Sequence, residues 1–131
     1  MFTIRVEHSI AAAHAIIIAG VREPLHGHNW HFQVTIERPN LDAEGLVCDF
    51  HVVHHHLVDV LAPFHNNNFN NVPPFRDSDA DALNPTAELI AKFVCDELTH
   101  RLANVLPKAC KVASVSVTEA PGCVATYFPG R

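Results

Sequence analysis

The sequence predicts an α+β fold of two layers, in which two helices cover one face of an antiparallel sheet. Alternating apolar and polar residues near both ends of the chain predict strands, and two stretches of helical periodicity lie between them. Neighbouring strands joined by short turns pair antiparallel, so the apolar helix faces must cover a single side of the sheet. A chain of 131 residues suits one core, and we take residues 1–131 as a single domain.

The predicted strands place apolar side chains at every second position, the pattern of a strand with one buried face. In the first strand these residues are Phe2, Ile4 and Val6. In the second strand, which begins at His28, they are Trp30, Phe32, Val34 and Ile36. Residues 45–50 predict a third, short strand, and residues 111–119 and 123–128 predict two more, joined by a Pro-Gly turn. The open edges of so small a sheet favour oligomers in which the sheet continues into a second copy.

Two helices are predicted between these strands. Residues 51–64 carry apolar side chains at helical spacing, and Asp49 precedes them as the N-cap. The second helix begins at Asn84, which is predicted to cap it, while Pro85 suits the first turn. This helix is predicted to stop at Pro107.

The composition excludes several kinds of partner. The chain has 9 Lys and Arg residues against 14 Asp and Glu residues, so it lacks the basic face that phosphate backbones require. The longest apolar run, residues 10–20, is interrupted by His14 and is too short to span a bilayer. Four cysteines without a CxxC pair suit a reducing compartment. We therefore expect a cytoplasmic protein that binds neither nucleic acid nor membrane.

Three of the 11 histidines are predicted to share one face of the sheet. His26 and His28 lie two residues apart in a strand, so their side chains point the same way. The alternation of the first strand puts His14 on the same inward face, after three small alanines. Three imidazoles can hold one Zn²⁺ and leave a fourth position for water or substrate, the pattern of catalytic zinc sites. The alternative is that these are ordinary hydrogen-bonded core histidines.

Glu119 is a second anomaly, because the alternation of its strand places it on the apolar side. A buried carboxylate requires hydrogen-bond donors, and the edge of a guanidine-like ring would satisfy both of its oxygens. Alternatively, the strand ends before Glu119 and the alternation no longer applies. His51 and His55 lie one helical turn apart and could share a second metal, although a solvated helix face is the simpler explanation.

Several short motifs follow one another along the chain in a specific order and spacing. They are His14 after an Ala-rich strand, Leu25-His26-Gly27-His28-Asn29, Val47-Cys48-Asp49-Phe50, Asn84-Pro85-Thr86-Ala87-Glu88 and Val117-Thr118-Glu119. Together they resemble the 6-pyruvoyl-tetrahydropterin synthase / 6-carboxy-tetrahydropterin synthase family. The resemblance covers nearly the whole chain, and the joint pattern is more specific than any single motif.

This resemblance implies a tunnelling fold (T-fold), in which strands of adjacent subunits join into a barrel, with trimers or hexamers and sites between subunits. It implies Zn²⁺ on His14, His26 and His28, with Glu119 gripping the pterin ring and Thr86 near that ring. The substrate of family members is dihydroneopterin triphosphate, whose side chain is rearranged or cleaved, and zinc there polarises the side-chain hydroxyls. The expected activity is therefore that of a zinc-dependent lyase acting on a reduced pterin.

The chain departs from the family at the positions that perform catalysis. Many members carry a catalytic Cys four residues before the first His of the HGH motif, and that position is Arg22 here. Glu23, however, precedes His26 as in the Glu-x-x-His-Gly-His variant of the family. Members with this variant release 6-hydroxymethyl-dihydropterin by a retro-aldol cleavage. A Glu in an apolar loop next to zinc can act as general acid/base, so Glu23 is the first candidate for this role.

A second departure affects the Asp-His pair of the family. Aligning Phe69-Asn70 with the Leu-Asn of the family places His65 at the Asp position and Asn66 at the His position. If the loop is one residue longer, His65 is itself an acid/base candidate. If it is not, the pair is absent, and the alternative function is a non-catalytic member that retains zinc and pterin binding. A further alternative is an oligomer that only holds metal.

Overall fold

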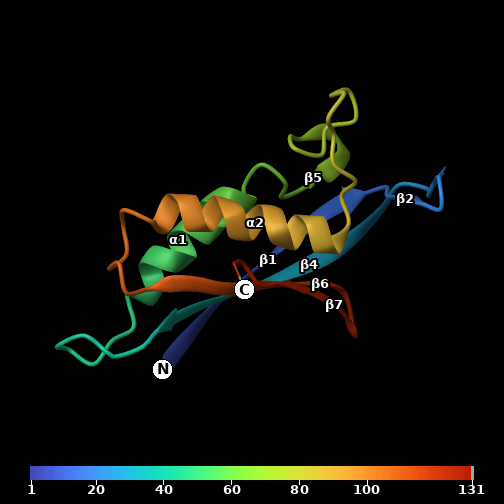
Figure 1. Ribbon diagram of the computed structural model, residues 1–131. Coiled ribbons are helices and arrows are strands. Elements are labelled where there is room, and N and C mark those ends of the chain that lie inside the picture. Colours follow the sequence, from blue (N-terminus) through green and yellow to red (C-terminus); the bar gives the residue numbers. More distant parts are fainter. Residues whose placement is uncertain (131) are drawn as a thin grey trace.

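The computed structural model describes residues 1–130 and contains the two layers that the sequence predicts (Figure 1). The strands are β1 (Phe2–His14), β2 (Ile17–Ile18), β3 (Val21–Arg22), β4 (His26–Arg38), β5 (Asn67–Asn68), β6 (Lys111–Ala120) and β7 (Cys123–Tyr127). The helices are α1 (Phe50–Leu61), the 3₁₀-helix η1 (Phe69–Asn71) and α2 (Ala87–Leu102). One sheet has the order β5-β1-β4-β6-β7, and β2 and β3 form a separate hairpin.

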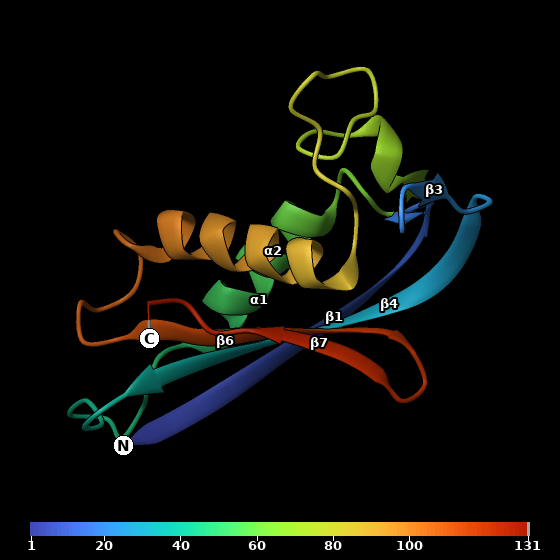
Figure 2. The same ribbon diagram turned by 45° about the vertical axis from the view of Figure 1, so that its right-hand side comes forward.

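The sheet is antiparallel except at one edge. β1 pairs with β4, β4 with β6 and β6 with β7 in antiparallel fashion, whereas the short β5 runs parallel to β1. Both long helices lie on the same face of this sheet, as Figure 2 shows. The predicted α+β fold, with two helices packed on one face of the sheet, is confirmed.

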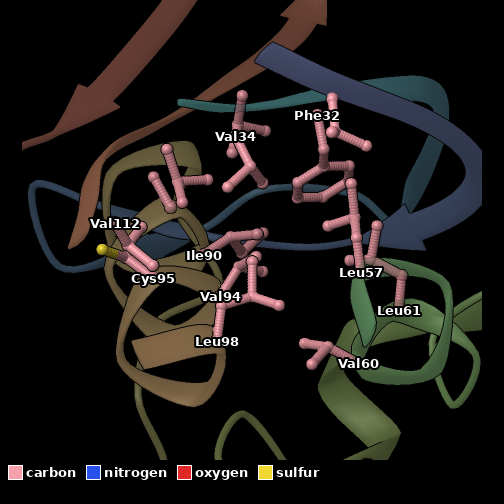
Figure 3. Packing of buried hydrophobic residues seen from close by; sticks show 14 of the residues in the cluster. Phe32, Val34, Leu57, Val60, Leu61, Ile90, Val94, Cys95, Leu98 and Val112 are labelled. Carbon is pink, nitrogen blue, oxygen red and sulfur yellow. The ribbon is translucent and has the colours of Figure 1, made fainter. Parts of the chain in front are cut away.

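The core lies between this face and the two helices (Figure 3). The alternation predicted for the second strand is confirmed, because each of its four apolar residues is 0% exposed: Trp30, Phe32, Val34 and Ile36. Leu57 of α1 and Ile90 of α2 pack against them and are equally buried. Burying one such side chain stabilises the folded state by about 1.5–3 kcal/mol, so this layer is the main source of stability.

The pairing of β1 with β4 positions the functional end of the sheet. Their register is continuous over the full length of both strands, from Phe2 opposite Arg38 to His14 opposite His26. The indole N–H of buried Trp30 donates to the carbonyl of Ala12 (3.0 Å), which ties the two strands together just before that end. The register therefore brings two histidines that are 12 positions apart in the sequence directly opposite one another.

The first helix begins where the sequence predicts and ends earlier. Asp49 is its N-cap, and its carboxylate accepts a hydrogen bond from the backbone N–H of His51 at 2.8 Å. The helix ends at Leu61 rather than at residue 64. Pro63 lacks a backbone N–H and cannot continue the helical hydrogen bonding, so the chain turns there. Within residues 1–130, neither long helix has the length and apolar character needed to cross a membrane.

Two expectations about local structure were wrong. Residues 45–50 do not form a strand. Instead, the Asp42 carboxylate accepts hydrogen bonds from the backbone N–H groups of Glu44 and Leu46, both at 2.9 Å, and Gly45 has φ 81°. These contacts bend the chain into a turn, because an Asp side chain competes with strand pairing for nearby N–H groups.

The second wrong expectation concerns the start of α2. Its N-cap is Thr86, whose hydroxyl accepts a hydrogen bond from the N–H of Leu89 at 3.1 Å. Asn84, predicted to be the cap, instead binds the backbone of Ile17 through its side-chain amide. The helix ends at Leu102, before the proline predicted to stop it. A Ser, Thr, Asp or Asn next to a helix start predicts a cap, but tertiary contacts decide which of two such residues is used.

Candidate metal centre and active site

Three histidines meet at the end of β1 and the beginning of β4. The ligand atoms of His14, His26 and His28 all lie within 4.8 Å of one another. The ring of His14 is buried, with 1% of its surface exposed, and the other two rings are partly buried. The structure thus brings together all three predicted metal ligands, from strands whose register places them at one end of the sheet.

Backbone carbonyls define the protonated nitrogen of two of these rings. Nδ1 of His14 lies 2.8 Å from the carbonyl of Pro85, and Nδ1 of His26 lies 2.9 Å from the carbonyl of Pro24. A carbonyl only accepts hydrogen bonds, so both Nδ1 atoms must donate, and each Nε2 then carries a lone pair. This tautomer, held by a carbonyl behind the ring, is typical of histidines that bind metals.

The free nitrogens of the cluster fit a zinc ion. The Nε2 atoms of His14 and His26 lie 3.1 Å apart, and two lone pairs at this distance repel unless a cation lies between them. Two ligands at about 2.0–2.1 Å from a tetrahedral Zn²⁺ would be about 3.3 Å apart, close to the observed distance. In addition, Nε2 of His28 is buried and has no hydrogen-bond partner among the described residues. A neutral three-nitrogen donor set of this kind suits Zn²⁺.

The electrostatics of His14 are consistent with a neutral ligand. Burial lowers the pKa of His14 below its ordinary value of 6.5, and this effect outweighs the Pro85 carbonyl and the Glu119 carboxylate, which act in the opposite direction. The ring is therefore neutral near pH 7, the form in which histidine binds metals.

Two carboxylates lie next to the cluster, each beside a different histidine. Oε1 of Glu119 lies 3.3 Å from Nε2 of His14, and Oε1 of Glu23 lies 3.6 Å from Nε2 of His26. Glu119 belongs to β6, where the pairing with β7 is irregular between Thr118 and Ala120, so it is not paired across the sheet. Both carboxylates are about a third exposed or less, which leaves them accessible to a substrate.

The backbone around Glu23 holds its carboxylate in place. Oε1 of Glu23 accepts a hydrogen bond from the N–H of Ile16 at 3.1 Å, and the N–H of Glu23 donates to the carbonyl of Ile16 at 2.9 Å. Glu23 is therefore attached to the segment that directly follows the candidate ligand His14. The structure places this candidate acid/base at the edge of the histidine cluster.

Thr86 and His65 lie in different surroundings. Thr86 caps α2 and follows Pro85, the residue whose carbonyl orients His14. His65 is exposed, and its Nδ1 accepts a hydrogen bond from the N–H of Ala11 at 3.3 Å, on the outer edge of β1. The cluster of ligating atoms in the described part of the chain does not include His65. Thr86 is thus next to the candidate site, whereas His65 belongs to the strand edge beside it.

Sequence reasoning missed two asparagines at this end of the sheet. Asn70 is 3% exposed and binds both backbone groups of Ala15, and Asn84 binds both backbone groups of Ile17. Residues 66–71 include five asparagines, a composition typical of a loop, and nothing in it distinguishes the buried Asn70 from its more exposed neighbours. The adjacent Phe69, which is fully buried, is the one local sign of burial.

An open groove of about 610 Å³ lies beside His28. It is lined by the end of β1, the beginning of β4 and the segment around β5: Ala11, Ala12, Ala13, Gly27, His28, Asn29, Asn66, Asn67 and Asn68. The groove is open to solvent. It provides room for a small molecule next to the histidine cluster.

Comparison with known proteins finds a matching family model and several solved structures of similar fold. The family model of 6-pyruvoyl tetrahydropterin synthase matches residues 3–130. No curated protein sequence is significantly similar to this chain. The 6-pyruvoyl tetrahydropterin synthase of Caenorhabditis elegans has a similar structure, with a TM-score of 0.78, 19% identity and coverage of 98% of this chain and 96% of that chain.

Two further structures are similar. A Plasmodium vivax 6-pyruvoyltetrahydropterin synthase, described as a catalytic residue mutant, has a TM-score of 0.77 at 20% identity, covering 99% of this chain and 98% of that chain. An uncharacterised protein of Wolinella succinogenes has a TM-score of 0.67 at 18% identity, covering 99% and 100%. These likenesses confirm the T-fold of this chain. Because the family model spans nearly all of its sequence, the chain belongs to the 6-pyruvoyl tetrahydropterin synthase family, a family of pterin-processing lyases.

Proposed function

We propose that this protein is a zinc-dependent lyase that cleaves the side chain of a reduced pterin. The proposed substrate is dihydroneopterin triphosphate or a close relative, and the proposed product is 6-hydroxymethyl-dihydropterin. The observation that carries this proposal is the cluster of three imidazole nitrogens with one carboxylate beside His14 and another beside His26. Such a combination offers a metal site, a proton acceptor and an anchor for a polar ring within one small volume.

In this proposal His14, His26 and His28 hold Zn²⁺. When bound there, the ion supplies Lewis-acid polarisation of the side-chain hydroxyls of the substrate. The contribution of the protein is to orient the rings. The carbonyls of Pro85 and Pro24 do this for His14 and His26 by accepting the hydrogen bonds from Nδ1.

Glu23 is the proposed general acid/base. A retro-aldol cleavage breaks the bond between the first two side-chain carbons and needs a base for the hydroxyl on the second carbon. Glu23 takes that proton as the second carbon becomes an aldehyde and the bond between the two carbons breaks. The electron pair of the broken bond forms a double bond from the first carbon to the ring, and the ring C=N bond accepts the displaced pair at its nitrogen. The same carboxyl group then returns a proton to the first carbon, which completes the hydroxymethyl group.

Glu119 and Thr86 are the proposed substrate-binding residues. A carboxylate can accept two parallel hydrogen bonds from the guanidine-like edge of a pterin, which suits the position of Glu119 beside His14. The hydroxyl of Thr86 accepts from Leu89 and can still donate its own hydrogen to a bound ring. His65, the second acid/base candidate, binds Ala11 on the outer edge of β1, so proton transfer is assigned to Glu23.

We also propose a cytoplasmic homo-oligomer, a trimer or hexamer with its sites between subunits. The support is apolar surface on the hairpin next to the site, where four side chains are more than half exposed: Ile17, Ile18, Val21 and Leu25. Exposed apolar clusters of this kind mark interaction surfaces. The edge strand β7 is also available for pairing with another copy. The free cysteines Cys48, Cys95, Cys110 and Cys123 suit a reducing compartment.

The deciding experiment incubates the zinc-loaded protein with dihydroneopterin triphosphate and separates the oxidised pterins by chromatography. We expect 6-hydroxymethylpterin to accumulate as the product. Metal analysis of the same protein should find about one zinc ion per chain. A pyruvoyl or carboxy product would assign a different reaction to the same site. Zinc and pterin binding without turnover would instead support the second candidate function, that of a non-catalytic binding protein. The observation behind this alternative is that Arg22 and Asn66 stand where the family has catalytic groups.

A further inference from the structure

We propose that Asn70, Asp77 and Arg22 are positioning residues that hold the Glu23 carboxylate against the histidine cluster. This inference rests on the proposed function, because it concerns the geometry of the acid/base assigned there. We call these three residues the tether. Their contacts connect residues 15–24, the segment that contains β2 and β3 and ends just after Glu23, to η1 and the loop that follows it.

The segment of residues 15–24 has little stability of its own. Its strands β2 and β3 contain only two residues each, and the side chains of Ile17, Ile18 and Val21 are 51–69% exposed. Two-stranded hairpins are marginally stable in water even when they are longer than this one. The conformation of the segment, and with it the position of Glu23, must therefore depend on contacts with the rest of the chain.

Asn70 provides the buried part of the tether. Its Oδ1 accepts a hydrogen bond from the N–H of Ala15 at 2.8 Å, and its Nδ2 donates to the carbonyl of the same residue at 3.0 Å. One amide side chain thus satisfies both backbone groups of the residue that follows the ligand His14, as a neighbouring strand would. In Figure 2 the hairpin segment around β3 lies beside η1, the short helix that carries Asn70.

Asp77 and Arg22 extend this connection to the other end of the segment. Nδ2 of Asn70 also donates to Oδ1 of Asp77 at 3.2 Å, and the N–H of Asp77 donates to the carbonyl of Asn70 at 2.9 Å. The other carboxylate oxygen of Asp77 accepts from Nη2 of Arg22 at 2.8 Å. Asn70 and Asp77 therefore hold the segment both at Ala15 and at Arg22, the residue next to Glu23.

The directions of Arg22 and Glu23 explain how the tether positions the carboxylate. Consecutive side chains of an extended chain point to opposite sides of the backbone. Arg22 binds Asp77, whereas the next residue, Glu23, binds the N–H of Ile16 and lies 3.6 Å from His26. Fixing the Arg22 side chain therefore fixes the direction of its neighbour. This gives a structural role to the residue that stands where the family resemblance places a catalytic cysteine.

The tether should act on Glu23 without acting on the metal ligands. His14, His26 and His28 belong to the long strands β1 and β4, whose pairing is continuous over 13 residues each. That pairing does not depend on residues 15–24. Loosening the tether is therefore expected to change the geometry of the acid/base while the zinc content and the fold remain as in the wild type.

The test measures amide hydrogen exchange of residues 15–24 and steady-state kinetics on the zinc-loaded oligomer. Asn70→Asp removes both amide donors and adds a carboxylate beside Asp77, and Arg22→Met removes the half-exposed ion pair. We expect exchange of this segment to accelerate at least about tenfold in Asn70→Asp, and about two- to fivefold in Arg22→Met. The value of kcat should fall about tenfold or more, with KM and zinc content within about twofold.

Two matched variants separate positioning from general destabilisation. Arg22→Lys retains the single charged contact and should restore most of the exchange protection and of kcat. Arg76→Met removes the neighbouring Arg76–Asp79 ion pair, which lies in the same loop without contacting residues 15–24, and should behave like the wild type. If Asn70→Asp fails to fold, the comparison of Arg22→Met with Arg22→Lys and Arg76→Met decides alone.

Unchanged exchange of residues 15–24 in both tether variants would overturn the inference. Faster exchange in the tether variants with an unchanged kcat would overturn the positioning role, because the tether contacts would then be structural only. A wild-type protein without turnover would overturn the proposed function, and with it the role of Glu23. These failures are distinguishable, since hydrogen exchange is measured independently of turnover.

Discussion

At the scale of single residues, the site depends on which nitrogen each histidine offers. The carbonyls of Pro85 and Pro24 accept hydrogen bonds from Nδ1 of His14 and His26, so Nε2 of both rings faces the centre of the cluster. His28 contributes a buried Nε2 that has no partner among the described residues. Two convergent nitrogens without hydrogens, beside a third buried nitrogen that has no partner, are costly in isolation and favourable around a cation.

We predict that His28→Ala loses zinc. Removing one of three ligands leaves two nitrogens, which bind Zn²⁺ far more weakly than a three-ligand site. Metal analysis after purification without added zinc should find about one ion per chain in the wild type and little in the variant. His31→Ala is the matched control, because His31 belongs to the same strand but binds Ser9 and Glu7. Zinc retained at wild-type level in His28→Ala would contradict the ligand assignment.

A second prediction at this scale concerns Glu23. Glu23→Gln keeps an oxygen that can accept the hydrogen bond from Ile16 but removes the group that takes up a proton. Turnover should therefore fall by about 10²- to 10⁴-fold, the usual contribution of a general acid/base, while zinc stays bound. The measurement is product formation from dihydroneopterin triphosphate, with metal content determined on the same sample. A variant that retains wild-type turnover would remove Glu23 from the mechanism.

At the scale of elements, three consecutive residues connect the start of α2 to the site. Asn84 binds the backbone of Ile17, the carbonyl of Pro85 orients His14, and Thr86 caps the helix. The position of the helix N-terminus therefore affects the orientation of His14, a candidate metal ligand. This coupling explains why the cap lies at Thr86, since Asn84 is already engaged with the hairpin segment.

Thr86→Ala should destabilise the protein by about 1 kcal/mol, because the N–H of Leu89 loses its hydrogen-bond acceptor at the helix start. Urea unfolding, followed by circular dichroism, measures this difference. Thr86→Ser retains the hydroxyl and should stay within a few tenths of a kcal/mol of the wild type. A Thr86→Ala variant as stable as the wild type would show that the cap does not limit the stability of α2.

His8 of β1, which contacts His54 of α1, should make the stability of the protein depend on pH. Burial, together with the rings of His54 and His65, lowers the pKa of His8 below its ordinary value of 6.5. Below pH 6.5 the unfolded chain binds a proton at His8 before the folded chain does, so stability decreases as the pH falls. His8→Gln should show a smaller decrease in the urea midpoint between about pH 7.5 and about pH 5.5. Equal decreases in both proteins would contradict this.

At the scale of the whole molecule, the candidate site lies at the margin of the core. The helices cover the middle of the sheet (Figure 2), whereas the three histidines lie where β1 ends and β4 begins. The ring of the core residue Trp30 packs against His14 and His28, with ring centroids 4.8 and 5.3 Å apart. Trp30, Phe32 and Phe64 are among the largest buried side chains, and they belong to the core rather than to the histidine cluster. Stability thus comes mainly from packing, and the site is built on the rigid ends of two long strands.

Removal of zinc should therefore lower stability without unfolding the protein. A ligand present at about 100 times its Kd stabilises the folded state by about 2.7 kcal/mol, and a chelator withdraws that contribution. Circular dichroism should show unchanged secondary structure at 25 °C after chelation, with a lower Tm that is restored by added zinc. Loss of the secondary structure signal on chelation would show that the metal is required for folding.

The sequence by itself determined the pattern of the elements and the candidate ligands. Alternation of apolar residues is a local property of β1 and β4, so it predicted both the buried face and the inward direction of His14, His26 and His28. Asp49 as the N-cap of α1 was equally local. Residues 45–50 were mistaken for a strand because the Asp42 side chain competes for their N–H groups, which apolar patterning does not reveal.

Only the tertiary structure decided the environment of each functional side chain. It brought the carboxylate of Glu23 next to His26 and that of Glu119 next to His14, and it placed His65 outside the histidine cluster. It also selected Asn70, among several asparagines in one loop, as the residue that holds Ala15. The physical reason is that direction along a strand follows from the backbone period, whereas hydrogen bonds between distant segments depend on where the whole chain places them.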